Sequence, residues 1–141
     1  MDVVLAMNKK TIVYGTVAAL SIITVTSIFI SDTENLEETF FVTATYYEQN
    51  RTVVITFQDR SEKTNLVTLE VLGMETSFQK KFNSSYFSKN ISLSSEPKYG
   101  WASIPVTFVV EHQEFGKVGI KTEIRSYNQI PAEVIFTKNL N

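Results

Sequence analysis

One uninterrupted apolar run near the N-terminus constrains this chain more than any other feature. Thr11–Ile30 (TIVYGTVAALSIITVTSIFI) holds 20 residues without a charge or a proline. Because an α-helix rises about 1.5 Å per residue, such a run spans roughly 30 Å, the thickness of the hydrocarbon core of a bilayer. The sequence therefore predicts a transmembrane helix over residues 11–30, in contact with membrane lipid.

The charges on the two sides of this run predict its orientation. Lys9 and Lys10 end the segment 1–10, whereas the segment after the run is acidic and no cation follows before Arg51. Lys and Arg flanking a membrane helix stay on the cytoplasmic side. We therefore expect residues 1–10 in the cytoplasm and the rest of the chain, after the helix, outside the cell membrane.

A cleaved signal peptide is the alternative interpretation of the run. The apolar region of a signal peptide is usually about 7–15 residues long and ends at a small-residue cleavage site. The run is longer, and no Ala-x-Ala site follows it, so we expect a retained signal anchor. Within it, Gly15 and Ala19 are candidates for packing against another helix, because small residues four apart let backbones approach closely.

The residues after the anchor, 31–38 (SDTENLEE), are polar and acidic. We interpret them as a tether, which reaches at most about 28 Å when fully extended. A domain on such a tether stays close to the membrane surface. Its neighbours would then be other membrane or envelope proteins.

Composition excludes several classes of function. The chain has 141 residues and no cysteine, which leaves no disulfide framework and no thiolate metal site. From Ser31 onward, 11 Lys and Arg face 14 Asp and Glu, a net charge of −3 without any cationic cluster. A nucleic-acid partner requires such a cluster, so we expect none.

From Thr39 onward, apolar residues alternate with polar ones at the period of a β-strand. Strands are expected over 39–47, 52–57, 66–72, 76–82, 86–93, 106–112, 117–125 and 133–138. Seven or eight short strands with a turn every 8–12 residues are typical of an antiparallel two-sheet sandwich. We therefore predict an all-β domain over 39–141, an immunoglobulin- or fibronectin-like β-sandwich, with a small closed barrel as the alternative.

Candidates for catalysis are few. His112 is the only histidine, and we interpret it as a strand-end residue beside a loop rather than as a base or a metal ligand, since no cysteine or second histidine accompanies it. No G-x-S-x-G elbow, P-loop or glycine-rich dinucleotide turn occurs. We therefore expect neither an enzyme nor a bound cofactor or metal.

The loop KYGW contains Tyr99 and Trp101, the residue types that most often anchor interfaces. Both are candidates for binding a partner. Core packing is the competing interpretation of Trp101, because sandwiches often bury a single tryptophan.

Three N-x-[ST] sequons begin at Asn50, Asn83 and Asn90, all on the side predicted to be exported. Such sites accept glycans when they lie at exposed turns. Asn50 and Asn83 fall at predicted turns, whereas Asn90 falls within a predicted strand. All three are glycosylation candidates.

The Lys-led anchor, the acidic tether, the sequons and the phrases VLGME (Val71–Glu75) and EFGKVGIKTEI (Glu114–Ile124) resemble small uncharacterised archaeal exported proteins. The resemblance spans much of the chain. It implies an envelope location facing outward from a single membrane, but no activity and no functional residues.

Together these features predict a non-catalytic membrane protein. A short tether restricts its partners to the membrane surface, which favours an accessory subunit that binds or stabilises a neighbouring membrane protein. An independent envelope receptor or adhesin, binding its ligand through loops, is the alternative.

Overall fold

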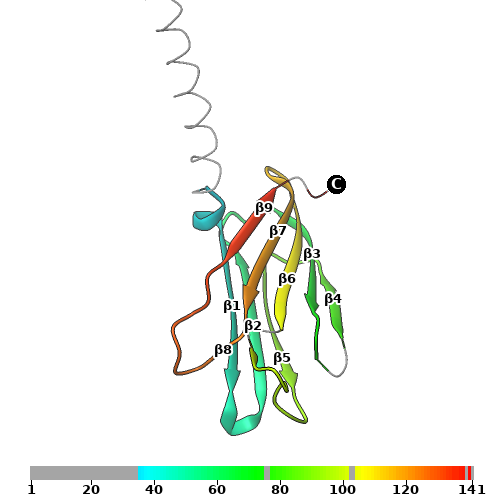
Figure 1. Cartoon of the computed structure of the whole chain (residues 1–141). Coiled ribbons are helices and arrows are strands. Elements are labelled where there is room, and N and C mark those ends of the chain that lie inside the picture. The colour runs from blue at the N-terminus through cyan, green and yellow to red at the C-terminus, as the bar shows by residue number, and fades with distance from the viewer. Residues whose placement is uncertain (1–34, 75–76, 102–103, 139, 141) are drawn as a thin grey trace, which may run out of the picture. The chain divides into compact units, whose positions relative to one another are not determined.

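The structure is a computed structural model and describes residues 35–74, 77–101, 104–138 and 140, which are mostly β-structure (Figure 1). Residues 35–39 are helical, and η1 (Glu48–Asn50) is a single 3₁₀ turn. The strands are β1 (Phe40–Tyr47), β2 (Thr52–Asp59), β3 (Thr64–Val71), β4 (Phe78–Phe82), β5 (Tyr86–Ser92), β6 (Pro105–His112), β7 (Gly116–Glu123), β8 (Arg125–Ser126) and β9 (Ile135–Lys138).

The predicted anchor, residues 11–30 with Gly15 and Ala19, lies outside the described residues. Within the residues that are described, no helix has the length and apolarity needed to cross a membrane.

The strands form two sheets, in the orders β5–β2–β1–β8 and β4–β3–β6–β7–β9. All neighbouring strands are antiparallel except β1 and β8, which are parallel over two residue pairs. The predicted all-β, two-sheet sandwich is therefore confirmed. Among the described residues there are nine strands rather than seven or eight, because the expected strand 117–125 breaks at Ile124 and its end becomes the two-residue β8.

Alternate residues of both sheets fill one core between them. Ile55 and Phe57 of β2 face Leu69 of β3 and Phe108 of β6, and all four are 0% exposed. Burial of apolar surface stabilises a fold by roughly 25 cal/mol per Å². Phe82 of β4 stacks on Phe87 of β5 with ring centroids 3.8 Å apart, which joins the two sheets along one side.

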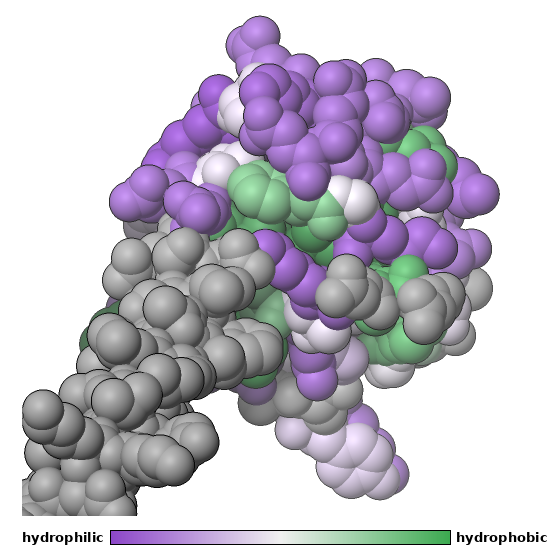
Figure 2. Space-filling view, turned by 90° about the horizontal axis from the view of Figure 1, so that it is seen from above, coloured by the Kyte–Doolittle hydropathy of each residue, from purple (hydrophilic) through white to green (hydrophobic). Residues whose placement is uncertain are grey.

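The strands run between two ends of the sandwich that carry different loops (Figure 1). At one end, here called the Leu36 end, Leu36 is 2% exposed and belongs to the core. The compact unit accordingly begins at Leu36, ahead of the expected boundary at Thr39. Viewed from this end, the surface is mostly hydrophilic around a smaller hydrophobic area (Figure 2).

The opposite end carries η1, the β3–β4 connection and the long β5–β6 connection, residues 93–104. This connection contains Tyr99 and Trp101. The single histidine and the aromatic loop therefore lie at opposite ends of the sandwich, because β6 runs from Pro105 at one end to His112 at the other.

Candidate functional site

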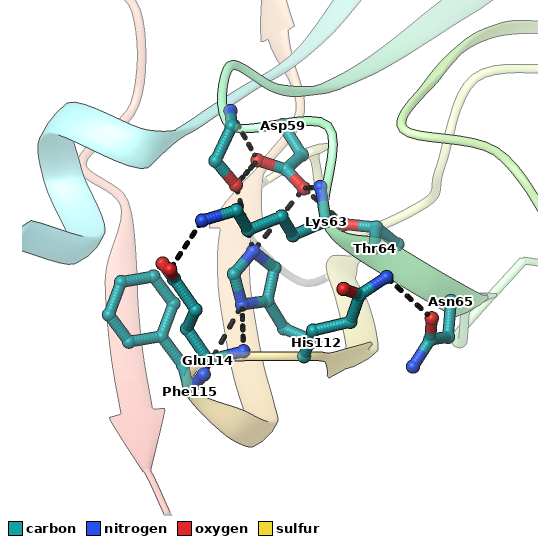
Figure 3. A network of polar contacts seen from close by, with 9 residues as sticks. Asp59, Lys63, Thr64, Asn65, His112, Glu114 and Phe115 are labelled. Carbon is teal, nitrogen blue, oxygen red and sulfur yellow. Dashed lines mark hydrogen bonds and ion pairs between the residues drawn. The ribbon is translucent and has the colours of Figure 1, made fainter.

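A buried carboxylate organises the Leu36 end (Figure 3). Asp59, the last residue of β2, is 2% exposed. Its Oδ1 accepts hydrogen bonds from the backbone N–H and the hydroxyl of Ser61, at 2.8 and 2.6 Å. Its Oδ2 accepts from the backbone N–H of Lys63 at 2.9 Å and the hydroxyl of Thr64 at 2.8 Å. The β2–β3 connection is thus folded around one carboxylate.

Hydrogen bonds set the ionisation of this carboxylate. Burial alone raises the pKa of the Asp59 carboxyl, because the ionised form loses hydration. The hydrogen bonds from Ser61, Thr64 and the backbone of Lys63 favour the ionised form and outweigh burial, so the pKa lies below its ordinary value. Asp59 is therefore held as a carboxylate by its own turn.

His112, the last residue of β6, meets this carboxylate from the other sheet. Its Nδ1 accepts the backbone N–H groups of Glu114 and Phe115, at 3.1 and 3.2 Å. Because Nδ1 is an acceptor, the network assigns the ring proton to Nε2. That Nε2 lies 2.9 Å from Oγ of Ser61 and 3.4 Å from Oδ2 of Asp59.

The network also holds the start of the folded unit. The ring of Phe40 packs edge-on against His112, with centroids 5.4 Å apart. Beside it, the backbone N–H of Arg60 donates to the carbonyl of Thr39 at 2.9 Å, and its guanidinium donates to the carbonyl of Glu38 at 3.0 Å. The residues before β1 are therefore fixed to the β2–β3 connection.

Ser61, His112 and Asp59 are the residue types of a hydrolase triad, but the hydrogen bonds among them are arranged differently. In a triad the histidine takes the serine proton at one nitrogen and donates to the aspartate from the other. Here the hydroxyl of Ser61 donates its hydrogen bond to Oδ1 of Asp59 at 2.6 Å, and Nδ1 of His112 accepts from backbone N–H groups. This geometry leaves the serine without a base.

A carboxylate close to His112 in the sequence is also paired with another side chain. Glu114, two positions after the histidine, forms an ion pair with Lys63 (Figure 3). Among the described residues, no three His, Asp or Glu side chains are grouped so that they could hold a metal ion.

The aromatic loop forms a groove at the opposite end of the sandwich, with a cavity of about 490 Å³. Its walls come from the β3–β4 connection, the start of β4, β5 and the β5–β6 connection, and include Met74, Phe78, Ile91, Tyr99 and Trp101. Cavities of roughly 300–1,000 Å³ are typical of ligand sites. The structure therefore brings both predicted binding residues, Tyr99 and Trp101, to one concave surface.

The two aromatic residues have different surroundings in this groove. Trp101 is half-buried against the core, and its ring centroid lies 4.4 Å from that of Tyr46. Tyr99 is 80% exposed, with Nζ of Lys98 5.5 Å from its ring centroid. Trp101 thus contributes to both the core and the groove wall, whereas Tyr99 is an exposed lining residue.

Tyr46, the residue whose ring contacts Trp101, is held in place by a hydrogen bond behind the groove. The buried hydroxyl of Tyr46 donates to Oε1 of Glu96 at 3.1 Å. Burial and the nearby carboxylate of Glu96 both raise the pKa of the Tyr46 hydroxyl. Glu96 itself lines the groove, so it offers a carboxylate beside an aromatic wall.

All three sequon asparagines are exposed. Asn50 ends η1, Asn83 lies in the β4–β5 connection, and Asn90 lies within β5. These are the positions that the sequence indicates for each of them.

Asp59 and Ser61 are the residues of this end that the strand pattern does not identify. Residues 59–65 look like a uniformly polar loop, but Asp59 belongs to β2 and Thr64 to β3. The available signal is local: an aspartate followed two residues later by serine is typical of a turn that the aspartate side chain caps.

Comparison of the chain with protein-family models, with curated proteins and with solved structures finds no match.

Proposed function

We propose that this is a non-catalytic, single-pass membrane protein whose β-sandwich binds or stabilises a neighbouring membrane protein, as an accessory subunit of a membrane complex. The observation that carries the proposal is the groove of about 490 Å³ with the exposed Tyr99 on its rim and Trp101 in its wall. Aromatic anchors at a concave surface are typical of sites that bind partners.

The start of the folded unit supports a position close to the membrane. Leu36 is already part of the core, so only residues 31–35 separate it from the predicted anchor that ends at Ile30. Five extended residues reach at most about 18 Å. A domain on this connection, facing outward from the membrane, would meet the exported parts of neighbouring membrane proteins.

The buried network supports a structural rather than a catalytic role for the only histidine. Both ring nitrogens of His112 are engaged by Ser61, Asp59 and backbone donors. A side chain without a free nitrogen has no means of binding a substrate proton. The proposal therefore assigns function to the surface of the sandwich.

The finer fold type is also a proposal. The order β1–β2–β5 in one sheet and β3–β6–β7 in the other corresponds to the A–B–E and C–F–G orders of immunoglobulin-like domains. An immunoglobulin- or fibronectin-like sandwich would suit a module that binds through loops.

Affinity purification of the full-length chain from native membranes in a mild detergent tests the function. We expect a partner membrane protein to co-purify and a complex larger than 16.0 kDa on native gels. Tyr99→Ala should reduce recovery of that partner at least fivefold, whereas Tyr127→Ala, also an exposed tyrosine at 71%, should not. Recovery of the chain only as a monomer would contradict the proposal.

A second candidate is an independent envelope receptor or adhesin that binds a ligand through its loops. The position of the groove favours it, because the groove lies at the end of the sandwich away from Leu36. Purified full-length chain in lipid nanodiscs, free of other membrane proteins, would then bind envelope glycans, and Tyr99→Ala would abolish this binding. Binding only in the presence of a second membrane protein would refute the receptor.

A further inference from the structure

The outward residues of β1, β2 and β5, all of which the structure describes, include no charged side chain. The fourth strand of this sheet, β8, places Arg125 at the edge beside Thr45, where it pairs with Glu123. The outward residues alternate with the core residues from Phe41 to Tyr47, from Thr52 to Gln58 and from Tyr86 to Ser92. These outward residues are Phe41, Thr43, Thr45 and Tyr47 of β1, Thr52, Val54, Thr56 and Gln58 of β2, and Tyr86, Ser88, Asn90 and Ser92 of β5. We call this surface the neutral face.

The second sheet shows that this neutrality is not a property of the whole domain. Its outer face carries six charged residues in the same kind of position: Glu70, Lys81, Glu111, Lys117, Lys121 and Glu123. Soluble sheet faces usually carry such charges, whereas the centres of interfaces are depleted of them and enriched in aromatic residues. The neutral face shares the lack of charge and carries three aromatic residues, Phe41, Tyr47 and Tyr86, of which Phe41 and Tyr86 are 43% and 58% exposed.

We propose that the neutral face is a self-association surface on which a second copy of this chain packs face to face. The exported part of the chain is acidic overall, so two copies repel each other wherever their charged surfaces approach. At the neutral face, identical surfaces meet without placing like charges opposite each other. An isologous contact requires a surface of this kind, because each patch meets its own copy.

The size of the neutral face fits such a contact. Three strands about 4.8 Å apart and about seven residues long give a footprint of roughly 14 by 24 Å. This planar footprint is roughly 340 Å². Because side chains project from it, its accessible surface is larger than the footprint, toward the roughly 800 Å² that each partner contributes to a standard interface.

The orientation of the neutral face suits two chains in one membrane. The strands run from the Leu36 end to the opposite end, so the face lies along the side of the sandwich. A two-fold axis parallel to the strands places Leu36 of both copies at the same end of the dimer. The grooves near Tyr99 then both lie at the other end, where the groove and the neutral face share Ser92.

The proposal has a consequence for one sequon. Asn90 is an outward residue of the neutral face, opposite Val54 of β2. A glycan there would keep two faces apart, so Asn90 must be unmodified in the dimer. Asn50 and Asn83 lie in connections outside the three strands and carry no such restriction.

The absence of cysteine from the chain allows a clean cross-linking test on the full-length protein in native membranes. Thr43→Cys and Thr56→Cys place a thiol at adjacent central positions of the neutral face, and Thr107→Cys places one mid-strand on the outer face of the second sheet. With a short bismaleimide, we expect a covalent dimer from Thr43→Cys and Thr56→Cys and at least tenfold less from Thr107→Cys. No dimer, or equal yields from both faces, would overturn the proposal.

A charge-insertion variant gives an independent readout. Thr56→Lys places two like charges opposite each other in the dimer, so its dissociation constant should rise at least tenfold by sedimentation in detergent. Thr107→Lys should leave it unchanged, and circular dichroism establishes that both variants are folded. An unchanged dissociation constant for Thr56→Lys, a heterologous protein cross-linked at Thr56→Cys, or a glycan on Asn90 of the native protein would each refute self-association.

Discussion

Nε2 of His112 lies 3.4 Å from Oδ2 of Asp59, and both side chains are 0% exposed. Asp59 ends β2 in one sheet and His112 ends β6 in the other, so the pair bridges the two layers at the Leu36 end. Buried polar pairs contribute specificity more than net stability, yet removing one partner is costly because the other is left unpaired. The pair therefore defines how the sheets meet where the chain begins its fold.

Replacing the carboxylate should destabilise the domain. Asp59→Asn presents one acceptor oxygen and an NH₂ group to four donors, so we expect the free energy of unfolding to fall by about 2–4 kcal/mol. Urea unfolding of the full-length chain in detergent, followed by fluorescence of the single tryptophan, measures it. The exposed Glu111→Gln is the control, with an expected change within about 0.5 kcal/mol. Equal stability of Asp59→Asn and the wild type would show that the network contributes nothing.

The same carboxylate predicts how stability depends on pH. Its pKa in the folded state lies below the unfolded value, which is about 3.9. The stabilisation is therefore fully present above pH 4 and is lost as the pH falls through the folded pKa, because the unfolded state then binds the proton more readily. Urea midpoints between pH 6 and pH 3 should fall more steeply for wild type than for Asp59→Asn. Parallel curves would assign the acid sensitivity to other carboxylates.

The period-two pattern predicts the strands well because successive side chains of a strand point to opposite faces, which is a property of the local backbone. Val67, Leu69 and Val71 are buried as their alternation indicates, and β4 is an edge strand as Lys80 suggests. How deeply a polar side chain is buried and which side chain it contacts cannot be predicted in this way, because both depend on residues far apart in the chain. Asp59 and His112 meet only through the stacking of two sheets, so a polar residue beside a turn gives no sign that it is buried.

The aromatic groove is predicted in part for the same reason. The composition of the loop makes Tyr99 and Trp101 candidates for binding a partner, and both line the groove. Glu96 of the long connection before β6 also lines the groove, and Tyr46 of β1 lies behind the wall and is hydrogen-bonded to Glu96. Tyr46 and Glu96 are 50 positions apart in the chain, so no local sequence pattern predicts their contact.

Tyr46 should titrate later than the other tyrosines of the described domain. Burial and Glu96 raise the pKa of its hydroxyl, so the folded state keeps this proton above the ordinary value of about 10. Its contribution to stability is present below pH 10 and is lost as the pH rises through the raised pKa. Ultraviolet absorbance of phenolate should show a late-titrating group that becomes earlier in Glu96→Gln and stays late in the control Glu133→Gln. A single early transition in wild type would contradict this contact.

Two inward-pointing lysines should protect the sandwich from edge-to-edge aggregation. β4 and β5 are edge strands of the two sheets, with Lys80 opposite Leu69 and Lys89 opposite Ile55. Each ammonium group lies over a phenylalanine ring, 5.4 Å from the centroid of Phe82 for Lys80 and 5.8 Å from that of Phe78 for Lys89. Charges that point inward at an edge oppose the addition of another strand, because the strand would bury them.

The double variant Lys80→Val with Lys89→Val removes this protection and adds β-branched residues to both edges. We expect it to fold with unchanged circular dichroism but to scatter light and form high-order oligomers at concentrations where the wild type does not. Lys81→Val with Lys117→Val, which replaces two outward lysines, is the control matched in charge and should scatter little. If both variants aggregate equally, the loss of two lysine side chains is responsible rather than their inward position. If neither does, the pairing of Phe82 with Phe87 across the sheets, whose rings stack at 3.8 Å, must itself close this side to a further strand.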